Sequence, residues 1–368
     1  MFTFSSRGFL GRRAPKLNHA PLVSPAPEPP TIDAKDPVVG VDAEEFWRRY
    51  APTFNKNTTI DFTTPKFQDY LVNTKRGRIH IRSMLTQFEL ALLYALGKDY
   101  YTGRGKIVDL GPLAGVGTNC LARGLSHNAR DLERTDVIYS YDLFLLAGMR
   151  HFLPSEYDNG TASIFQRFLE LNRDFQESIV IVPGDFLQMS WGGYPIEILF
   201  IDLAKTWKLN KHVIANFFPH LFPGSIVIQQ DYVHFGEPWV ALTMEYFEEY
   251  FERLYFIYGA TAVYRCIKKI PEDKLSIDFE AMELDEMDRL FASARTKVTP
   301  AIAEVLKTAQ ARAHLLKGDL EGAKNWLDQV NLEARDGGDV ATEFRGSLKA
   351  GFNGVKREID RVTAAPSS

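Results

Sequence analysis

Short apolar runs alternate with amphipathic segments between residues 106 and 270. Five runs rich in β-branched residues end in or near an acidic residue or a glycine, at 106–111, 137–142, 179–185, 196–202 and 225–231. Such runs are typical of strands that are covered on both faces, as in a parallel α/β sheet. Two more runs, 254–259 and 262–269, follow a helix expected over 238–253 and predict a closing antiparallel hairpin. Residues 105–270 are therefore predicted to form an α/β domain.

The segments on either side of this domain have different patterns. Residues 1–40 are rich in Pro, Ala and Ser and lack apolar periodicity, which predicts a disordered tail. Residues 41–104 predict a helical extension, whose apolar stripe at near-helical spacing consists of Leu85, Phe88, Leu92 and Leu96. A packing helix is the favoured interpretation of that stripe, and a lid over a cofactor is the alternative. Residues 271–368 predict a C-terminal helical appendage for packing or dimerisation, with a helix–turn–helix pair over 303–330.

A glycine-rich turn follows the first strong strand and precedes a predicted helix. It has the spacing Asp109-x-Gly111-x-x-x-Gly115-x-Gly117. Glycine lets the backbone turn sharply and approach a ligand closely, and the helix behind the turn offers free N–H groups. The turn therefore predicts a cradle for a nucleotide-like cofactor. A dinucleotide is one alternative, although Cys120 stands where its fingerprint needs a third glycine.

The whole order of elements resembles a class I S-adenosylmethionine-dependent methyltransferase. The first motif of that family is matched by Asp109, Gly111, Gly115 and Gly117, and its second motif, an acid that ends strand two, by Asp142. Further matches are Asp185-Phe186 after strand three, Asp202 at the end of strand four, and the closing hairpin. The resemblance covers roughly residues 80–270. It implies a Rossmann-like fold, with a mostly parallel seven-stranded sheet and a terminal antiparallel hairpin, and S-adenosylmethionine as the cofactor.

The matched residues have expected roles in holding that cofactor. Asp142 would accept hydrogen bonds from the two ribose hydroxyls, because a carboxylate is a paired acceptor. Asp185 would accept the adenine amino group, and Phe186 or Leu143 would pack on the ring. Asp109 would order the glycine turn or contact the amino group of the methionine portion. The alternative for each acid is a solvated loop residue or a helix cap.

The acceptor half resembles small-molecule and sugar O-methyltransferases, with departures. In that subgroup strand four often ends Asp-Gly-Asp-His-x-Tyr and strand five ends Asp-Asp-Tyr. Here the corresponding residues are Asp202-Leu203-Ala204-Lys205-Thr206-Trp207 and Gln230-Asp231-Tyr232. Hard cations need several charged oxygens, and only Asp202 and Asp231 remain, so we expect no metal.

Without a metal, methyl transfer to oxygen needs a group that removes the proton of the acceptor. Lys205 and His234 are the two candidate bases, with Asp202 and Asp231 to orient them. The expected reaction is O-methylation of a small molecule, and Trp207, Trp239 and Tyr232 are candidate walls of its pocket. Two other functions stay open: a catalytically silent methyltransferase-like binding protein and, less favoured, a nicotinamide-dependent enzyme.

Composition limits the classes of binding partner and the cellular compartment that we expect. Forty-three basic and 47 acidic residues give a net charge of −4, which argues against nucleic acid or an anionic membrane as partner. The two cysteines form no disulfide framework and fit a reducing compartment. No apolar run reaches the roughly 18 residues that a membrane span needs. The sequence therefore predicts a cytoplasmic protein, and the additional helices make a homodimer one alternative for its oligomeric state.

Overall fold

The computed structural model of this chain describes residues 59–60, 83–145, 163–257, 260–334 and 341–364. The predicted tail at 1–40 and most of the predicted extension at 41–104 lie outside the described residues. Within them, eight strands form one sheet in the order β1-β7-β8-β6-β5-β2-β3-β4. The strands are β1 (Thr59–Ile60), β2 (Lys106–Leu110), β3 (Ile138–Asp142), β4 (Ile179–Pro183), β5 (Ile196–Ile201), β6 (Leu221–Gln229), β7 (Phe251–Ile257) and β8 (Thr261–Cys266).

The direction of the strands confirms the predicted Rossmann-like sheet. Strands β2 to β6 pair in parallel, whereas β8 runs antiparallel to both β6 and β7. The seven predicted strands are β2 to β8, and the two-residue β1 adds to them by pairing with β7. This pairing covers part of an edge that would otherwise leave backbone donors and acceptors unpaired.

Two boundaries of the prediction were wrong. β6 begins at Leu221, not after the Pro223-Gly224 turn, because the chain bulges there while Leu221 and Ile226 both pair with β5. Bulges tolerate a proline and a glycine that an ordinary ladder position would not, and Gly224 has φ of 104°. The helix expected over 238–253 ends at Tyr246, since residues from Phe251 onward form β7 and pair with β8.

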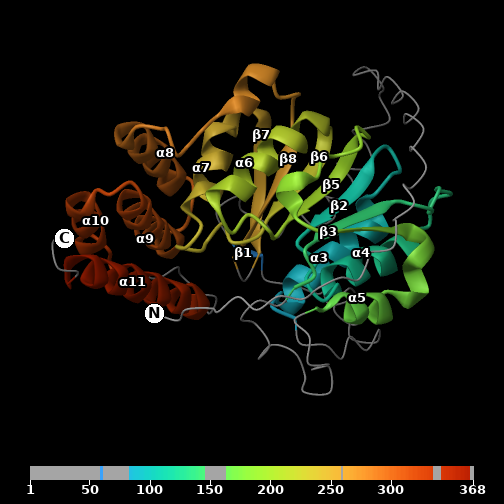
Figure 1. Cartoon of the computed structure of the whole chain (residues 1–368), viewed down its shortest axis with the longest axis horizontal. Helices are drawn as coiled ribbons and strands as arrows, with labels where there is room; N and C mark the ends of the chain where they lie inside the picture. The colour runs from blue at the N-terminus through green and yellow to red at the C-terminus, as the bar shows by residue number, and fades with distance from the viewer. Residues whose placement is uncertain (1–58, 61–82, 146–162, 258–259, 335–340, 365–368) are drawn as a thin grey trace, which may run out of the picture.

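Helices cover both faces of the sheet (Figure 1). Along β2, Ile107 belongs to the core shared with α3, α4 and α5, and Val108 to the core shared with α6 and α7. This alternation is the two-residue period of a strand that is buried on both sides. The helical elements of the α/β region are α3 (Gln87–Ala95), η2 (Leu96–Tyr100), α4 (Val116–Ser126), α5 (Phe165–Leu171), η5 (Arg173–Ser178), η6 (Phe186–Gln188), α6 (Trp207–Asn216), η7 (Phe218–His220), α7 (Pro238–Tyr246) and η8 (Glu248–Tyr250).

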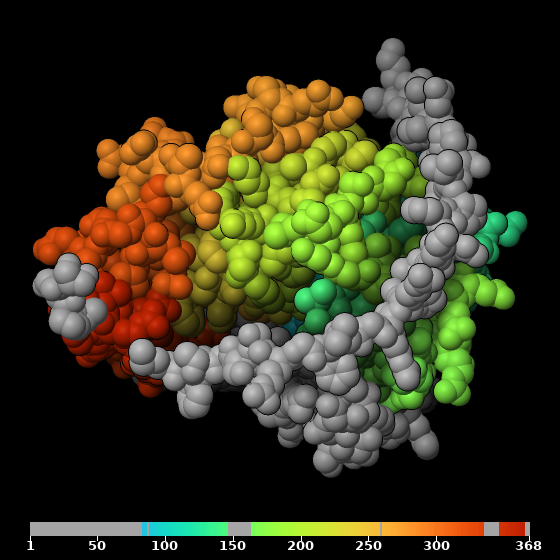
Figure 2. All heavy atoms as spheres, viewed as in Figure 1, coloured from blue at the N-terminus to red at the C-terminus, as the bar shows by residue number. Residues whose placement is uncertain are grey.

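The C-terminal helices gather at one end of the molecule, in orange and red in Figure 2. They are α8 (Leu284–Thr296), α9 (Pro300–Leu316), α10 (Leu320–Asp328) and α11 (Ala341–Ala364). The short η9 (Glu272–Ser276) precedes them and contacts α6 and η7. α9 and α10 form the predicted helix–turn–helix pair, with Gly318 at φ of 80° in the turn. Phe291 and Leu306 belong to the same apolar core as Val227 of the sheet. α8 and α9 therefore extend this core of the α/β region, whereas Ala323 of α10 and Val355 of α11 belong to a separate, smaller cluster.

In the part of the chain that the structure describes, no helix is both long and apolar enough to cross a bilayer.

Cys120 and Cys266 are buried and free, in α4 and β8. This agrees with the helix and the strand that the sequence predicted for them.

Candidate functional site

A cavity of about 520 Å³ opens where β2, β3, β5 and β6 end. In open α/β sheets, ligands bind outside the carboxyl ends of the strands. Seven of the residues that the sequence singled out line this cavity, namely Gly111, Gly117, Asp142, Asp202, Lys205, Asp231 and His234. The structure thus brings the glycine turn and the acceptor candidates together.

The glycine turn has a backbone that other residues would not adopt. Gly111 and Gly115 have φ of 93° and 86°, in the left-handed region. A Cβ on Gly115 would also lie 2.5 Å from Asn172 Nδ2. Gly115 is the N-cap of α4, and Gly117 in the first turn of that helix lines the cavity. The positive end of the α4 dipole is therefore directed toward the ligand space.

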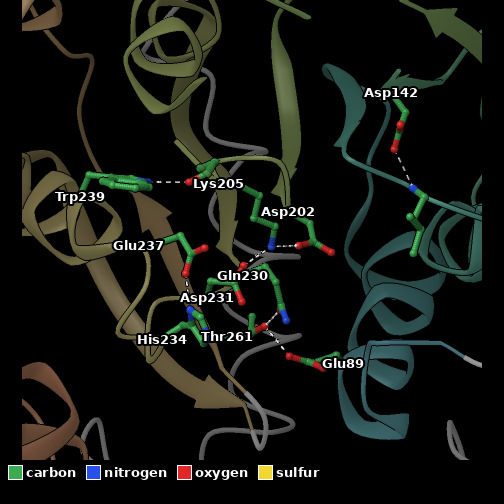
Figure 3. A network of polar contacts seen from close by, with 12 residues as sticks. Glu89, Asp142, Asp202, Lys205, Gln230, Asp231, His234, Glu237, Trp239 and Thr261 are labelled. Atoms are coloured by element: carbon green, nitrogen blue, oxygen red, sulfur yellow. Dashed lines mark hydrogen bonds and ion pairs between the residues drawn. The ribbon is translucent and has the colours of Figure 1, made fainter. Parts of the chain in front are cut away.

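Asp142, at the end of β3, is tied to the turn by backbone amides. Its Oδ2 accepts a hydrogen bond from Leu113 N at 2.9 Å (the dashed line at Asp142 in Figure 3), and its Oδ1 accepts one from Phe144 N at 2.6 Å. Burial raises the pKa of Asp142, and these backbone hydrogen bonds oppose the shift. Leu113 and Phe144 have φ of 52° and 53°, which is unusual for residues with side chains. Each carboxylate oxygen keeps acceptor capacity for a ligand hydroxyl.

Asp109 lies beneath the turn. It is fully buried, and Thr118 Oγ1 donates to its Oδ2 at 2.5 Å. Burial raises the pKa of Asp109 to about 7. Because Thr118 is in α4, this contact favours the expected role of ordering the turn over the alternative of contacting a ligand.

Three residues predicted to hold the adenine are not among the described residues that line the cavity. Asp185 caps η6, where its Oδ1 accepts from Leu187 N at 3.1 Å. Phe186 is in the apolar core, stacked on Phe217 with ring centroids 5.5 Å apart. Leu143 is 55% exposed. The structure explains Asp185 as a cap and Phe186 as core, so their contact with a cofactor stays a prediction.

Asp202, Lys205 and Asp231 form an ionic cluster at the ends of β5 and β6 (Figure 3). Lys205 Nζ donates to Asp202 Oδ1 at 2.8 Å and also to Asp231 Oδ2. Burial tends to lower the pKa of Lys205, but the attraction of the two carboxylates outweighs it and raises that pKa. Burial raises the pKa of Asp202, and the charge of Lys205 opposes this. Lys205 therefore stays protonated, and a protonated amine does not suit the role of base that the sequence suggested for it.

His234 and Glu237 form a second polar pair beside this cluster. His234 Nδ1 is hydrogen-bonded to Glu237, and this bond raises the pKa of the imidazole. The Gly236 N–H also lies 3.2 Å from Nδ1, but an ionised Glu237 can only accept, so the contact with Glu237 requires the proton on Nδ1. The lone pair of the neutral ring then lies on Nε2. This arrangement fits a proton acceptor that is oriented by a carboxylate. Glu237 was not singled out from the sequence.

Sequence reasoning also missed Glu89, a buried acid that lines the cavity. It forms a capping box with Thr86 at the start of α3, and Thr261 Oγ1 donates to its Oε1 at 2.6 Å. Burial raises the pKa of Glu89, and the hydrogen bond from Thr261 opposes this. Thr261 also contacts Gln230, so the amide that replaces an expected acid is part of this network. The spacing Thr-x-x-Glu before an apolar run was the available signal.

The predicted aromatic walls separate into two groups. Tyr232 is fully buried in the core, 5.3 Å from the ring of Phe256. Trp207 and Trp239 instead line a second cavity, which adjoins Lys205. Among the described residues, no group of three or more His, Cys, Asp or Glu is placed to hold a metal ion.

The strand order and the glycine turn define the fold. Apart from β1, the order β7-β8-β6-β5-β2-β3-β4 places an antiparallel strand between β6 and β7. A dinucleotide-binding sheet of order 3-2-1-4-5-6 has no such inserted strand. The antiparallel insertion, the glycine turn after β2 and the acid that ends β3 define the Rossmann-like methyltransferase fold.

Comparisons with known proteins give distant likenesses of the same kind. No protein-family model and no curated protein matches this chain. The O-methyltransferase NovP is similar over 62% of this chain and 100% of its own, at 14% identity and a TM-score of 0.40. Calicheamicin methyltransferase CalS11 is similar over 60% of this chain and 91% of its own, at 19% identity and a TM-score of 0.35. An O-methyltransferase from Bacillus cereus in complex with SAH is similar over 62% of this chain and 100% of its own, at 14% identity and a TM-score of 0.32. Such distant matches carry no argument about chemistry, which has to come from the residues of this chain.

Proposed function

We propose that this protein transfers a methyl group from S-adenosylmethionine to a hydroxyl of a small molecule without a bound metal ion. One observation carries the proposal: a single cavity joins the glycine turn and Asp142 to Lys205 and His234. A cofactor cradle and a group able to accept a proton are the two parts that such a transfer needs.

The cofactor half of the cavity fits S-adenosylmethionine. The turn from Gly111 to Gly117 would lie along the methionine portion, since both residues line the cavity and the turn leads into the N-terminus of α4. The Asp142 carboxylate, which is fixed by two backbone amides, would accept the ribose hydroxyls. When bound, the cofactor supplies a strongly electrophilic methyl group on a sulfonium.

In the acceptor half, the Lys205 ammonium takes the place of a metal ion. Its ammonium lies between Asp202 and Asp231, the carboxylates that would otherwise attract a metal. A cation in this position would hold the acceptor oxygen and stabilise negative charge on it. His234, held by Glu237, would accept the hydroxyl proton at Nε2 while the oxygen forms its bond to the methyl group.

The test is calorimetric titration of the full chain with S-adenosylmethionine and S-adenosylhomocysteine. We expect dissociation constants in the micromolar range, about −8 kcal/mol. Asp142→Ala should weaken both at least about tenfold, since a buried acceptor is lost. Asp174→Ala, which removes an exposed acid of η5, is the matched control and should bind normally. A folded chain that binds neither compound would contradict the proposal, and binding without transfer to any acceptor would favour the silent binding protein.

A further inference from the structure

A second cavity, of about 440 Å³, lies between the α/β region and the C-terminal helices. Its walls come from α6, α7, α8, α9 and the turn at 279–280. Lys205 lines both this cavity and the one at the strand ends. The two spaces therefore meet at the residue that we place beside the acceptor oxygen.

Three aromatic rings give the second cavity a fixed apolar wall. Trp207 lies with its ring centroid 6.3 Å from that of Trp239, at an interplanar angle of 60°. Phe279 is edge-on to Trp207, at 4.6 Å and 83°. Edge-to-face arrangements of this kind are favoured by the ring quadrupoles, so the wall is set before a ligand arrives.

The polar atoms of this wall are already engaged by the protein. Trp239 Nε1 donates to Ala204 O at 2.5 Å, and Trp207 Nε1 donates to Asp278 Oδ1 at 3.3 Å (Figure 3 shows the first). Asp278 also holds Lys211 of α6 at 2.5 Å, which fixes the turn at 279–280 against that helix. The indoles thus present carbon surfaces to the cavity.

The remaining apolar lining comes from the helices, mainly Leu242, Met287, Ala313 and Leu316. Lys317, at another part of the lining, donates to Glu280 O at 2.6 Å and is thereby engaged. The polar groups of the β5–α6 connection, Lys205 and Thr206, also belong to the lining. A ligand thus meets carbon surface in most of the cavity and Lys205 where the two cavities adjoin. The ammonium of Lys205 points toward Asp202 and Asp231 (Figure 3).

We propose that this cavity binds the acceptor, and that the acceptor is a flat, largely apolar ring compound with a hydroxyl group. Its ring would lie against Trp239 and Phe279, and its hydroxyl would point to Lys205. The volume suits such a molecule, since ligand cavities commonly hold about 300–1,000 Å³. A sugar fits poorly, because apolar walls would leave its hydroxyls without partners. Methylation of the hydroxyl rests on the proposed function, whereas binding of the ring does not.

The experiment uses 2-naphthol as the probe, titrated calorimetrically into the full chain. Leu316, which is 51% exposed on the lining, is changed to Glu, and Ile267, 48% exposed after β8, is changed to Glu as the matched control. We expect saturable binding at one site, weakened at least tenfold by Leu316→Glu and less than twofold by Ile267→Glu. Both variants alter half-exposed positions and should fold, which circular dichroism verifies.

No binding to the native chain, or equal weakening by both variants, would overturn this assignment. The titration with S-adenosylmethionine keeps the two proposals apart. Naphthol binding of the expected pattern without cofactor binding would reject methyl transfer and keep the ring site. Cofactor binding without naphthol binding would keep the proposed function and reject the ring site.

Discussion

Single side chains at the ends of β5 and β6 carry most of the proposed chemistry, and Lys205 is the central one. It is bonded to Asp202 and Asp231, and their attraction raises its pKa although partial desolvation opposes this. The residue thus acts as a built-in positive charge. The same contact would leave two facing carboxylates without compensation if the lysine were removed.

The first prediction concerns that charge. Lys205→Ala should reduce methyl transfer by about 100-fold or more, because the acceptor oxygen loses its cation. Magnesium ions should raise the midpoint of thermal unfolding of this variant, since two carboxylates with no lysine between them attract a hard cation. Lys208→Ala, an exposed position on α6, should leave both measurements unchanged. A Lys205→Ala enzyme with native rates would contradict the assigned role.

The second prediction is a pH profile. Glu237 raises the pKa of His234 above its ordinary value of 6.5. Below that raised pKa the imidazole is protonated and cannot accept a proton, so kcat/KM should rise with pH through it. Glu237→Gln weakens the hydrogen bond, and the acid limb should shift to lower pH while the maximum rate falls about tenfold or more. An acid limb that stays in place would show that another group titrates there.

Individual residues also mark where sequence reasoning stopped. The glycine turn and Asp142 could be predicted, because their chemistry follows from adjacent positions in the chain. Glu237 and Thr261 could not, because their importance comes from contacts with His234 and Glu89 that only the folded chain creates. Phe186 shows the reverse, since a residue next to a motif position proved to be part of the core.

At the scale of elements, α11 is in contact with the loop that carries His234. The ring of Phe235 lies against Gly354, and its Cβ lies near Gly351, so two glycines of one helical face form a notch. His234 and Phe235 have ring centroids 5.0 Å apart. The helix therefore packs against the loop in which the proposed base lies.

The third prediction tests this notch. A Cβ at Gly354 would lie within 2.6 Å of the Phe235 ring, so Gly354→Ala should displace the loop and lower kcat. Overpacking of this kind costs about 1–3 kcal/mol of stability. Gly346→Ala on the same helix is the control, because no described atom lies within 4 Å of its added Cβ. It should gain roughly 0.5–1 kcal/mol and keep native kcat. Cofactor affinity should be unchanged in both, and equal kcat values would refute the role of the notch.

Elements were predicted better than their ends. The long strands follow from dense β-branched runs, and each prediction overlaps an observed strand. The predicted ends were wrong where a tertiary contact determines the end of an element. β6, for example, continues through Pro223 and Gly224 by bulging against β5. The notch of α11 was invisible in the sequence, because its glycines and Phe235 are more than 100 residues apart.

For the whole molecule, one continuous core joins the sheet to α8, α9 and part of α11. Buried residues of α8 and α9 and Leu348 of α11 belong to the same cluster as β5 and β6. A shared core couples the unfolding of the parts that contribute to it. The predicted division near residue 271 thus separates stretches of sequence that pack together.

The fourth prediction follows from this core. Scanning calorimetry should give one cooperative transition, with equal calorimetric and van't Hoff enthalpies, for the α/β region and the C-terminal helices together. Phe291→Ala removes a fully buried ring where α8 contributes to the core and should cost about 3–5 kcal/mol. That change should move the whole transition to lower temperature. Two separate transitions would show that the helices unfold independently.

Lys205 is the one described residue that lines both cavities, which has a consequence for the order of binding. Any ligand that changes the position or the hydrogen bonds of this side chain from one cavity is sensed in the other. Thermodynamic linkage makes this influence reciprocal. If the bound cofactor changes the affinity for a ring compound by some factor, the bound ring compound changes the affinity for the cofactor by the same factor. Selectivity for the acceptor would then depend on the methyl donor already in place, as well as on the shape of the aromatic wall.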